Sequence, residues 1–304
     1  NKIVEGDVDR FIDNSNVTNN YSIFYNSIKE MPYNVDQLYE AIRKLCIIDI
    51  FVENDDDPQL IFESLNSTGL KLTEADMIRN FVLMGLDAKT QEEYYTHYWL
   101  DIEKNTNKTK TANFFRDYLT VKQGKIPAIR DVYFVFKKYA EDKDISPILV
   151  ELLKYSKIYN KILTSHTLCK DIDITLKRLN TLDMTVTYPF LLALFDYAQE
   201  VELPEEDLIN TLSCLETYIV RRLICGIPTN ALNTIFCTLH KDVLRMKRNT
   251  DSYSSVVIYI LENKTSFSSF PKDENFKASF ITKDIYSMQK KNKLYLFERL
   301  ENGD

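Results

Sequence analysis

The feature that most constrains the fold is a helical spacing of apolar residues, which continues from Thr73 almost to the end of the 304-residue chain. Apolar side chains that recur every three or four residues line one face of an α-helix and predict that this face is buried. With only 6 Gly and 8 Pro, the chain offers few of the turns that a β architecture needs. We predict helices over residues 90–103, 112–121, 129–141, 146–163, 172–181, 186–199, 205–225, 230–246, 252–262 and 283–301, with loops at 105–111 and 266–274.

The first part of the chain predicts a different organisation. Two helical patterns, over 21–31 and 34–45, precede Leu45–Glu53, whose β-branched and nearly continuous apolar residues indicate a buried strand. Pro58, with acidic residues just before it, is typical of the first turn of a further helix. We therefore expect a mainly α protein, with a small α/β portion over residues 1–86 and an all-helical domain over residues 87–304.

Charge and cysteine usage narrow the class of protein. The net charge is −7, which is unlike a general nucleic-acid binder, although a local basic patch could still bind phosphates. The five cysteines are odd in number and widely separated, a pattern typical of free thiols in a reducing cytoplasm. No apolar run approaches the length of roughly 18–20 residues that a membrane span requires, so we expect a cytoplasmic protein.

One junction, FESLNSTGLKLTEADMIRNF, is specified more tightly than the rest of the chain. Asn66 ends one helical pattern, and Gly69 supplies a residue that tolerates positive φ where the chain reverses. Thr73 is a candidate N-cap, with Asp76 three residues later as in a capping box. The local chemistry therefore predicts a helix, a turn and a second helix.

The same turn could also bind an anion. Asn66, Ser67 and Thr68 precede Gly69, so several side-chain and backbone donors are close together ahead of a helix N-terminus. Such turns can bind phosphate groups. A purely structural turn explains the same residues, and the four-residue pattern by itself does not decide between the two.

The longer string, IFESLNSTGLKLTEADMIRNFVL, closely resembles the F-x-x-x-N-x-x-G-x-x-L region of the GmrSD-type restriction endonucleases. A second string, YIVRRLICGIPTNALNTIF over residues 218–236, is similar to a Y-x-x-R-R-x-x-C-G-x-x-T helical segment later in the same proteins. Both strings occur in the order of that family. The positions that match the first region are Phe62, Asn66, Gly69, Leu72, Asp76, Ile78, Arg79 and Asn80.

The resemblance implies an N-terminal domain of ParB-like fold that binds and hydrolyses a nucleotide, followed by a helical region. Many members end in an HNH-type nuclease domain and act in phage defence, often against modified DNA. The D-G-Q-Q-R motif and the HNH domain of the family do not occur in this sequence, so we expect the central part of a larger enzyme. The implied cofactor of that enzyme is GTP or ATP with Mg, and the implied nucleotide-binding residues are Asn66, Ser67, Thr68, Gly69 and Arg79.

A basic segment, from Arg221 to Thr250, begins within the second string and continues beyond it. It contains a single acidic residue, Asp242, and it could contact DNA phosphates. A solvated helical face is the simpler explanation of the same residues. The candidate DNA-contacting residues are Arg221, Lys241, Arg245, Lys247 and Arg248.

Arg222 continues the apolar stripe of Leu208, Leu212, Leu215 and Ile219, so we expect it to be buried. A buried guanidinium requires a carboxylate, carbonyl or phosphate partner, and an internal ion pair is the simplest of these. The neighbouring Arg221 points away from the stripe and is expected to be solvated.

The sequence contains no complete catalytic set. His97, His166 and His240 are far apart, and Cys237 with His240 lacks the second pair of ligands that a zinc site needs. No phosphate-binding loop or nucleophile motif is found. The alternative to an enzyme fragment is therefore a non-catalytic helical module that binds a partner or forms a homo-oligomer.

Overall fold

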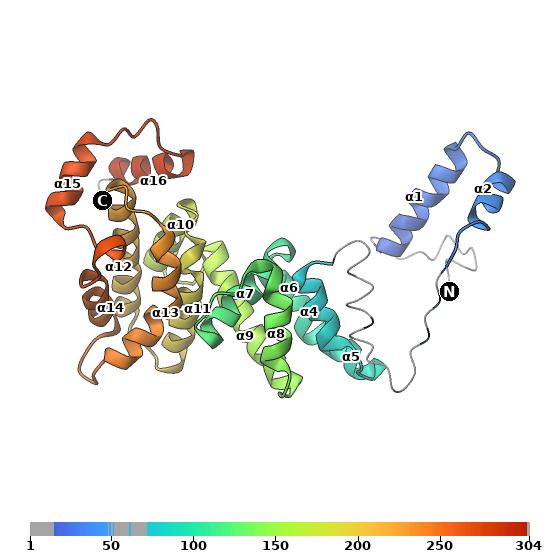
Figure 1. Ribbon diagram of the computed structural model, residues 1–304, viewed down its shortest axis with the longest axis horizontal. Helices are drawn as coiled ribbons and strands as arrows, with labels where there is room; N and C mark the ends of the chain where they lie inside the picture. The colour runs from blue at the N-terminus through green and yellow to red at the C-terminus, as the bar shows by residue number, and fades with distance from the viewer. Residues whose placement is uncertain (1–14, 48, 50, 52–60, 62–71, 303–304) are drawn as a thin grey trace. The chain divides into compact units, whose positions relative to one another are not determined.

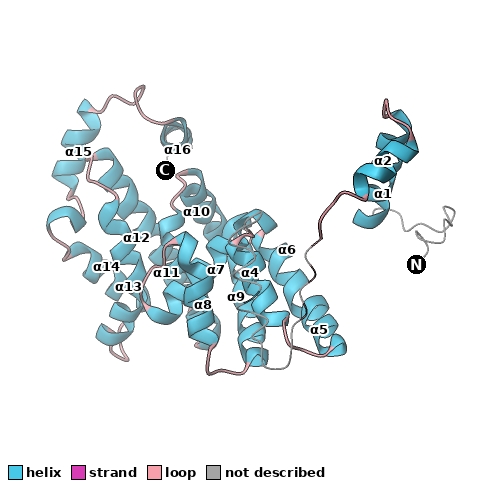
Figure 2. Cartoon of the chain, turned by 45° about the vertical axis from the view of Figure 1, so that its right-hand side comes forward, coloured by secondary structure: helices cyan, strands magenta, loops and turns pink. Residues whose placement is uncertain are grey.

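The computed structural model describes residues 15–47, 49, 51, 61 and 72–302, and all the regular elements among these residues are helices (Figures 1 and 2). The prediction of a mainly α protein is thereby confirmed. The chain divides into two compact units, Asn1–Asp56 and Asp57–Asp304.

The first unit contains α1 (Asn16–Glu30) and α2 (Val35–Ile42), close to the two helices expected from the sequence. Asn34 begins α2 with a capping box, since its side chain accepts from the Gln37 backbone at 2.8 Å while the Gln37 side chain accepts from the Asn34 backbone. Neither helix has a buried residue. Local propensity defines α1, which has no side-chain cap, and a capping box adds to it in α2, because no described residue of either helix is buried.

The buried strand expected at Leu45–Glu53 is not found among the described residues of that segment. Leu45, Ile47 and Phe51 have 69%, 88% and 82% of their surface exposed, and none is in a strand. A strand needs a neighbouring strand to pair its backbone N–H and C=O groups, and the described part of the chain provides none. The apolar composition was therefore a misleading indicator of strand structure.

The second unit is a layered array of helices (Figure 1). In its first half α4 packs on α7 and α8, while α6 packs on α9. A π-helical segment, Tyr95–Trp99, joins α5 to α6 and directs Trp99 into the core, where it is fully buried. The helices of this half are α4 (Glu74–Leu83), α5 (Ala88–Tyr94), α6 (Leu100–Thr106), α7 (Thr111–Gln123), α8 (Val132–Ala140) and α9 (Ile145–Thr164).

In the second half α11 packs on α7, α9 and α13, and α12 packs on α10 and α14. The helices α15 and α16 follow, with α15 on α12 and α16 on α10. The helices of this half are α10 (Lys170–Thr181), α11 (Tyr188–Glu200), α12 (Glu205–Ile224), α13 (Asn230–Met246), α14 (Tyr253–Glu262), α15 (Asp273–Thr282) and α16 (Lys290–Glu301). Short 3₁₀ turns occur at Lys108–Lys110, Ile129–Asp131, Thr185–Thr187 and Ser266–Ser268.

Aromatic side chains connect the layers. Trp99 stacks on Phe115 with ring centroids 5.7 Å apart, and Phe114 meets Tyr159 edge to face at 5.3 Å. Tyr159 in turn contacts Tyr188 of α11 at 5.4 Å. Pairs of this kind contribute roughly 0.5–1.5 kcal/mol beyond the burial of their area, so they help to fix how α6, α7, α9 and α11 pack.

Two sequence predictions for the C-terminal part were wrong. The helix expected over 283–301 begins only at Lys290. The helix α15 lies mostly over residues 275–282, where no element was predicted, and takes in the last two residues of the loop expected over 266–274. α15 has no buried residue, so the periodic apolar stripe that marks the other helices is weak there. Asp273 and Glu274 could have predicted the start of α15, because acidic side chains in the first turn interact favourably with the helix dipole.

The boundary between the two compact units falls between residues 56 and 57 of the sequence, before the domain boundary expected near residue 86. The reason is α4, which lies before residue 86 yet packs on α7 and α8 of the helical array. The assignment of residues 1–86 to a ParB-like domain stays a prediction.

Candidate functional site

The turn Asn66–Gly69 lies outside the described residues. Of the candidate nucleotide-binding residues, the structure therefore describes only Arg79, on α4. At the N-terminus of α4, Thr73 and Asp76 form the predicted capping box: the Asp76 backbone donates to Thr73 Oγ1 at 3.2 Å, and the Thr73 backbone donates to Asp76 Oδ2 at 3.3 Å. The capping box thus stabilises the first helical turn of α4, a few residues after Asn66–Gly69 in the sequence.

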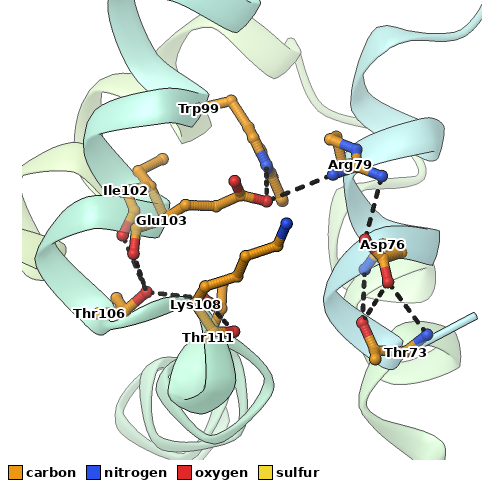
Figure 3. A network of polar contacts seen from close by, with 9 residues as sticks. All are labelled: Thr73, Asp76, Arg79, Trp99, Ile102, Glu103, Thr106, Lys108 and Thr111. Carbon is orange, nitrogen blue, oxygen red and sulfur yellow. Dashed lines mark hydrogen bonds and ion pairs between the residues drawn. The ribbon is translucent and has the colours of Figure 1, made fainter. Parts of the chain in front are cut away.

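Arg79 connects this cap to the helical array (Figure 3). Its guanidinium lies 3.0 Å from an Asp76 carboxylate oxygen and 3.4 Å from Glu103 Oε1 on α6. The same Glu103 oxygen accepts the indole N–H of the buried Trp99 at 2.8 Å. The side chain of Arg79 is 26% exposed and that of Glu103 is 16% exposed, so the pair is shielded from much of the solvent.

This network joins α4 to α6 through ion pairs and a hydrogen bond. A phosphate that approached Arg79 would have to compete with the carboxylates of Asp76 and Glu103. The arrangement instead connects α4 to α6, because Glu103 contacts Arg79 and also accepts a hydrogen bond from the buried Trp99. Arg79 is therefore well placed to link the N-terminus of α4 to the array.

Arg222, from the second matched string, is buried as expected, with 2% of its surface exposed. Its partners are backbone carbonyls: it donates to Ser269 at 3.1 Å, to Pro228 at 2.8 Å and to Phe267 at 2.9 Å. The guanidinium also lies over the ring of Tyr218. Carbonyls take the place of the expected ion pair, while the buried Nε has no hydrogen-bond partner among the described residues. The carbonyls of Phe267 and Ser269 anchor the segment after α14 to α12.

Arg221 is not the solvated side chain that the sequence indicated. It lies 2.7 Å from an Asp273 carboxylate oxygen, donates to the Pro271 carbonyl at 3.0 Å, and lies over the rings of Phe270 and Phe276. The side chain is 25% exposed. Its contacts attach α15 to α12, and any role at DNA would require Arg221 to leave them.

The other candidate DNA-contacting residues lie towards the C-terminus of α13 and just beyond it. Lys241, Arg245 and Arg248 are exposed, and Lys247 is half-buried. Arg245 pairs with Asp242 at 2.8 Å, and the Lys247 ammonium is 3.4 Å from the Arg248 carbonyl. These four residues are close together in the sequence, whereas the side chain of Arg221 is engaged with α15.

A cluster that sequence reasoning missed lies between α10, α12 and α16. Glu216 is buried, accepts the Tyr295 hydroxyl at 2.7 Å, and lies 3.9 Å from Arg178 Nε and 4.0 Å from Arg299 Nε. Burial, with the nearby Glu216 charge, raises the pKa of Tyr295 above its usual range, so this hydroxyl stays a donor. The adjoining cleft of about 380 Å³ has apolar walls formed by Val220, Phe276, Phe280, Leu296 and Leu300.

The described residues contain no group of three or more His, Cys, Asp or Glu side chains that could hold a metal ion. His240 contacts the Tyr253 hydroxyl at 2.8 Å, and burial lowers its pKa, which favours the neutral imidazole. Burial raises the pKa of the Cys237 thiol, which disfavours the thiolate form that binds metals.

In the part of the chain that the structure describes, no helix is both long enough and apolar enough to cross a bilayer. Comparison with known protein families, with curated proteins and with solved structures finds no match to this chain.

Proposed function

We propose that this chain is the central part of a GmrSD-like, nucleotide-dependent restriction endonuclease that acts in the cytoplasm, in phage defence and against modified DNA. The observation that carries the proposal is the pair of matched strings, over residues 61–83 and 218–236, which occur in the order of that family. A predominantly helical array after residue 72 agrees with the helical region that the resemblance implies.

In this proposal Asn66, Ser67, Thr68 and Gly69 line one side of a pocket for GTP or ATP with Mg, and the remaining residues of the pocket belong to the upstream part of a ParB-like domain. Arg79 is the last candidate member of the set. Its contacts with Asp76 and Glu103 support a role in coupling the pocket to the helices. The helical array then relays the state of the nucleotide towards a nuclease domain downstream.

The first test is the coding sequence on both sides of this chain. The proposal expects a D-G-Q-Q-R motif upstream and a histidine-bearing HNH segment downstream. Flanks that contain neither motif would exclude a restriction enzyme of this kind.

The second test is hydrolysis of GTP and ATP by the full-length protein. We expect Asn66→Ala to reduce hydrolysis at least tenfold, because an amide that contacts the nucleotide would be lost. Asn20→Ala, which removes an exposed amide on α1, is the matched control and should retain full activity. Equal rates for the wild type and Asn66→Ala would show that the pocket assignment is wrong.

A non-catalytic interaction module is the second candidate function, and α1 and α2 favour it. These helices bury no residue, and Phe24, Tyr25 and Tyr39 are 68%, 56% and 62% exposed. Aromatic side chains of this kind are enriched in protein interfaces. Equilibrium sedimentation of the chain should then show a dimer that Phe24→Ser with Tyr25→Ser dissociates, whereas a monomer at high concentration that captures no partner would count against this role.

A further inference from the structure

A groove of about 650 Å³ lies where the connection between α7 and α8 faces α8. Ile126 and Pro127 line it with apolar atoms, and Lys125, Lys138 and Asp131 line it with charged groups. Both lysines are exposed. The groove therefore combines a short apolar surface with two ammonium groups that can reach a ligand.

The charge around this groove is opposite in sign to that of the whole protein. Residues 122–138 contain five basic side chains and one acidic side chain, Asp131, in a chain of net charge −7. Lys122 is paired with Glu151, and Arg130, whose side chain is 86% exposed, lies 3.8 Å from Asp131. A weak, exposed contact of this length leaves the guanidinium able to bind an anion.

Lys241 extends this basic surface from α13. Gly124 ends α7 with φ +68°, and a Cβ built there would lie 2.8 Å from Lys241 Nζ. The glycine thus satisfies two requirements, since it adopts the left-handed conformation and leaves room for the ammonium group. The Lys241 ammonium lies at the C-terminal end of α7, where a positive charge interacts favourably with the helix dipole. Lys125 follows Gly124 directly in the sequence.

An exposed aromatic ring completes the groove. Phe134 lines it and is 58% exposed, one turn before Lys138 on α8. Proteins that bind single strands combine a positively charged groove with aromatic side chains on which unstacked bases lie. The bases of a duplex remain stacked on one another, so the ring favours a single strand as the occupant.

We propose that this groove binds a single-stranded nucleic acid, with Lys125, Lys138, Arg130 and Lys241 at the phosphates and Phe134 under one base. The site goes beyond the function proposed above, because it uses residues outside both matched strings. It requires neither nucleotide hydrolysis nor a nuclease domain. Of the DNA-contacting residues expected from the sequence, it retains Lys241 and adds residues from the connection between α7 and α8 and from α8.

The experiment is fluorescence anisotropy of a labelled single-stranded oligonucleotide of mixed sequence, titrated with the 304-residue chain at several salt concentrations. We expect Lys125→Glu with Lys138→Glu to weaken binding at least tenfold at low salt. The slope of log K against log salt is negative, and it should become less steep by about 1.4, since each single-strand phosphate contact contributes about 0.7 to its magnitude. Phe134→Ala should weaken binding at least fivefold while leaving that slope unchanged.

The matched control is Lys157→Glu with Lys177→Glu, which makes the same change of charge at exposed lysines on α9 and α10. It should bind as the wild type does, and circular dichroism should show that all variants stay folded. The proposal is overturned if the control reversal weakens binding as much as the groove reversal. It is also overturned if a duplex of the same sequence binds as tightly and Phe134→Ala has no effect. Either result leaves the two tests of the proposed enzyme function unaffected.

Discussion

Asp207 of α12 caps the N-terminus of α14, and its carboxylate accepts the backbone N–H of Tyr253 at 2.7 Å. The other carboxylate oxygen accepts the N–H of Ser254, also at 2.7 Å, and Ser252 accepts the N–H of Ser255 at 3.2 Å. The first three amides of α14 therefore all have acceptors. Because such amides have no partner within their own helix, a buried carboxylate from another helix both satisfies them and orients α14 against α12.

We predict that Asp207→Ala lowers the free energy of unfolding by about 2–4 kcal/mol, since two buried N–H groups lose a charged acceptor. Urea unfolding followed by circular dichroism measures this change. Asp207→Asn, which retains one acceptor oxygen, should show a smaller loss. Ser252→Ala removes an ordinary cap and should cost about 1 kcal/mol. If Asp207→Ala cost less than Ser252→Ala, the buried carboxylate would not be the main cap of α14.

Asp117 on α7 should make the stability of the protein depend on pH. Its side chain is buried, one carboxylate oxygen has no hydrogen-bond partner among the described residues, and burial raises its pKa to about 7 despite the neighbouring Arg116. The unfolded chain loses this proton near pH 4, while the folded protein keeps it until about pH 7. Stability should therefore fall as pH rises through this window, by at most about 4 kcal/mol, and should stay low above it.

Asp117→Asn removes the titrating group, so its unfolding free energy should change much less between pH 4 and pH 7. At pH 8 the variant should be more stable than the wild type, because no charge is then buried. Asp101→Asn, an exposed carboxylate on α6, is the control and should retain the pH profile of the wild type. Parallel profiles for wild type and Asp117→Asn would assign the pH dependence to other groups.

The elements that the sequence predicted well are those whose signals are local. The helices expected over 146–163, 205–225 and 230–246 are observed at Ile145–Thr164, Glu205–Ile224 and Asn230–Met246. The capping box of Thr73 and Asp76 was likewise predicted from neighbouring residues alone. In each case a helical stripe or a cap fixes the structure within a few residues of the signal.

Features that depend on distant partners could not be predicted. Glu216 meets Tyr295, 79 residues away, and no pattern in the sequence relates the two. The burial of Arg222 followed from its stripe, whereas its partners are carbonyls, which every residue carries and which no sequence pattern marks. The candidate nucleotide turn was chosen by resemblance, and it lies outside the described residues. Local periodicity thus predicts helices, and packing determines which side chains meet between them.

Arg222→Met should destabilise the protein by roughly 3 kcal/mol or more, because three carbonyls would lose a charged donor within the core. Limited proteolysis should then cut between residues 266 and 272, the segment that Arg222 holds. Arg222→Lys keeps the charge but lacks the planar fork, so it should be intermediate. Arg221→Met, at a residue that is 25% exposed, should cost less. Equal losses for the Arg221 and Arg222 variants would argue against a special role for the buried guanidinium.

Arg79 and Glu103 should be energetically coupled if α4 is joined to α6 through them. A double-mutant cycle with Arg79→Met and Glu103→Gln should give a coupling free energy of about 0.5–1.5 kcal/mol in urea unfolding, because this pair is largely shielded from solvent. The exposed pair Arg245 and Asp242 is the comparison, and its coupling should not exceed about 0.5 kcal/mol, since the Arg245 side chain is 76% exposed. A coupling for Arg79 and Glu103 no larger than that of the surface pair would remove the structural basis for a relay through α4, whatever the nucleotide site upstream does.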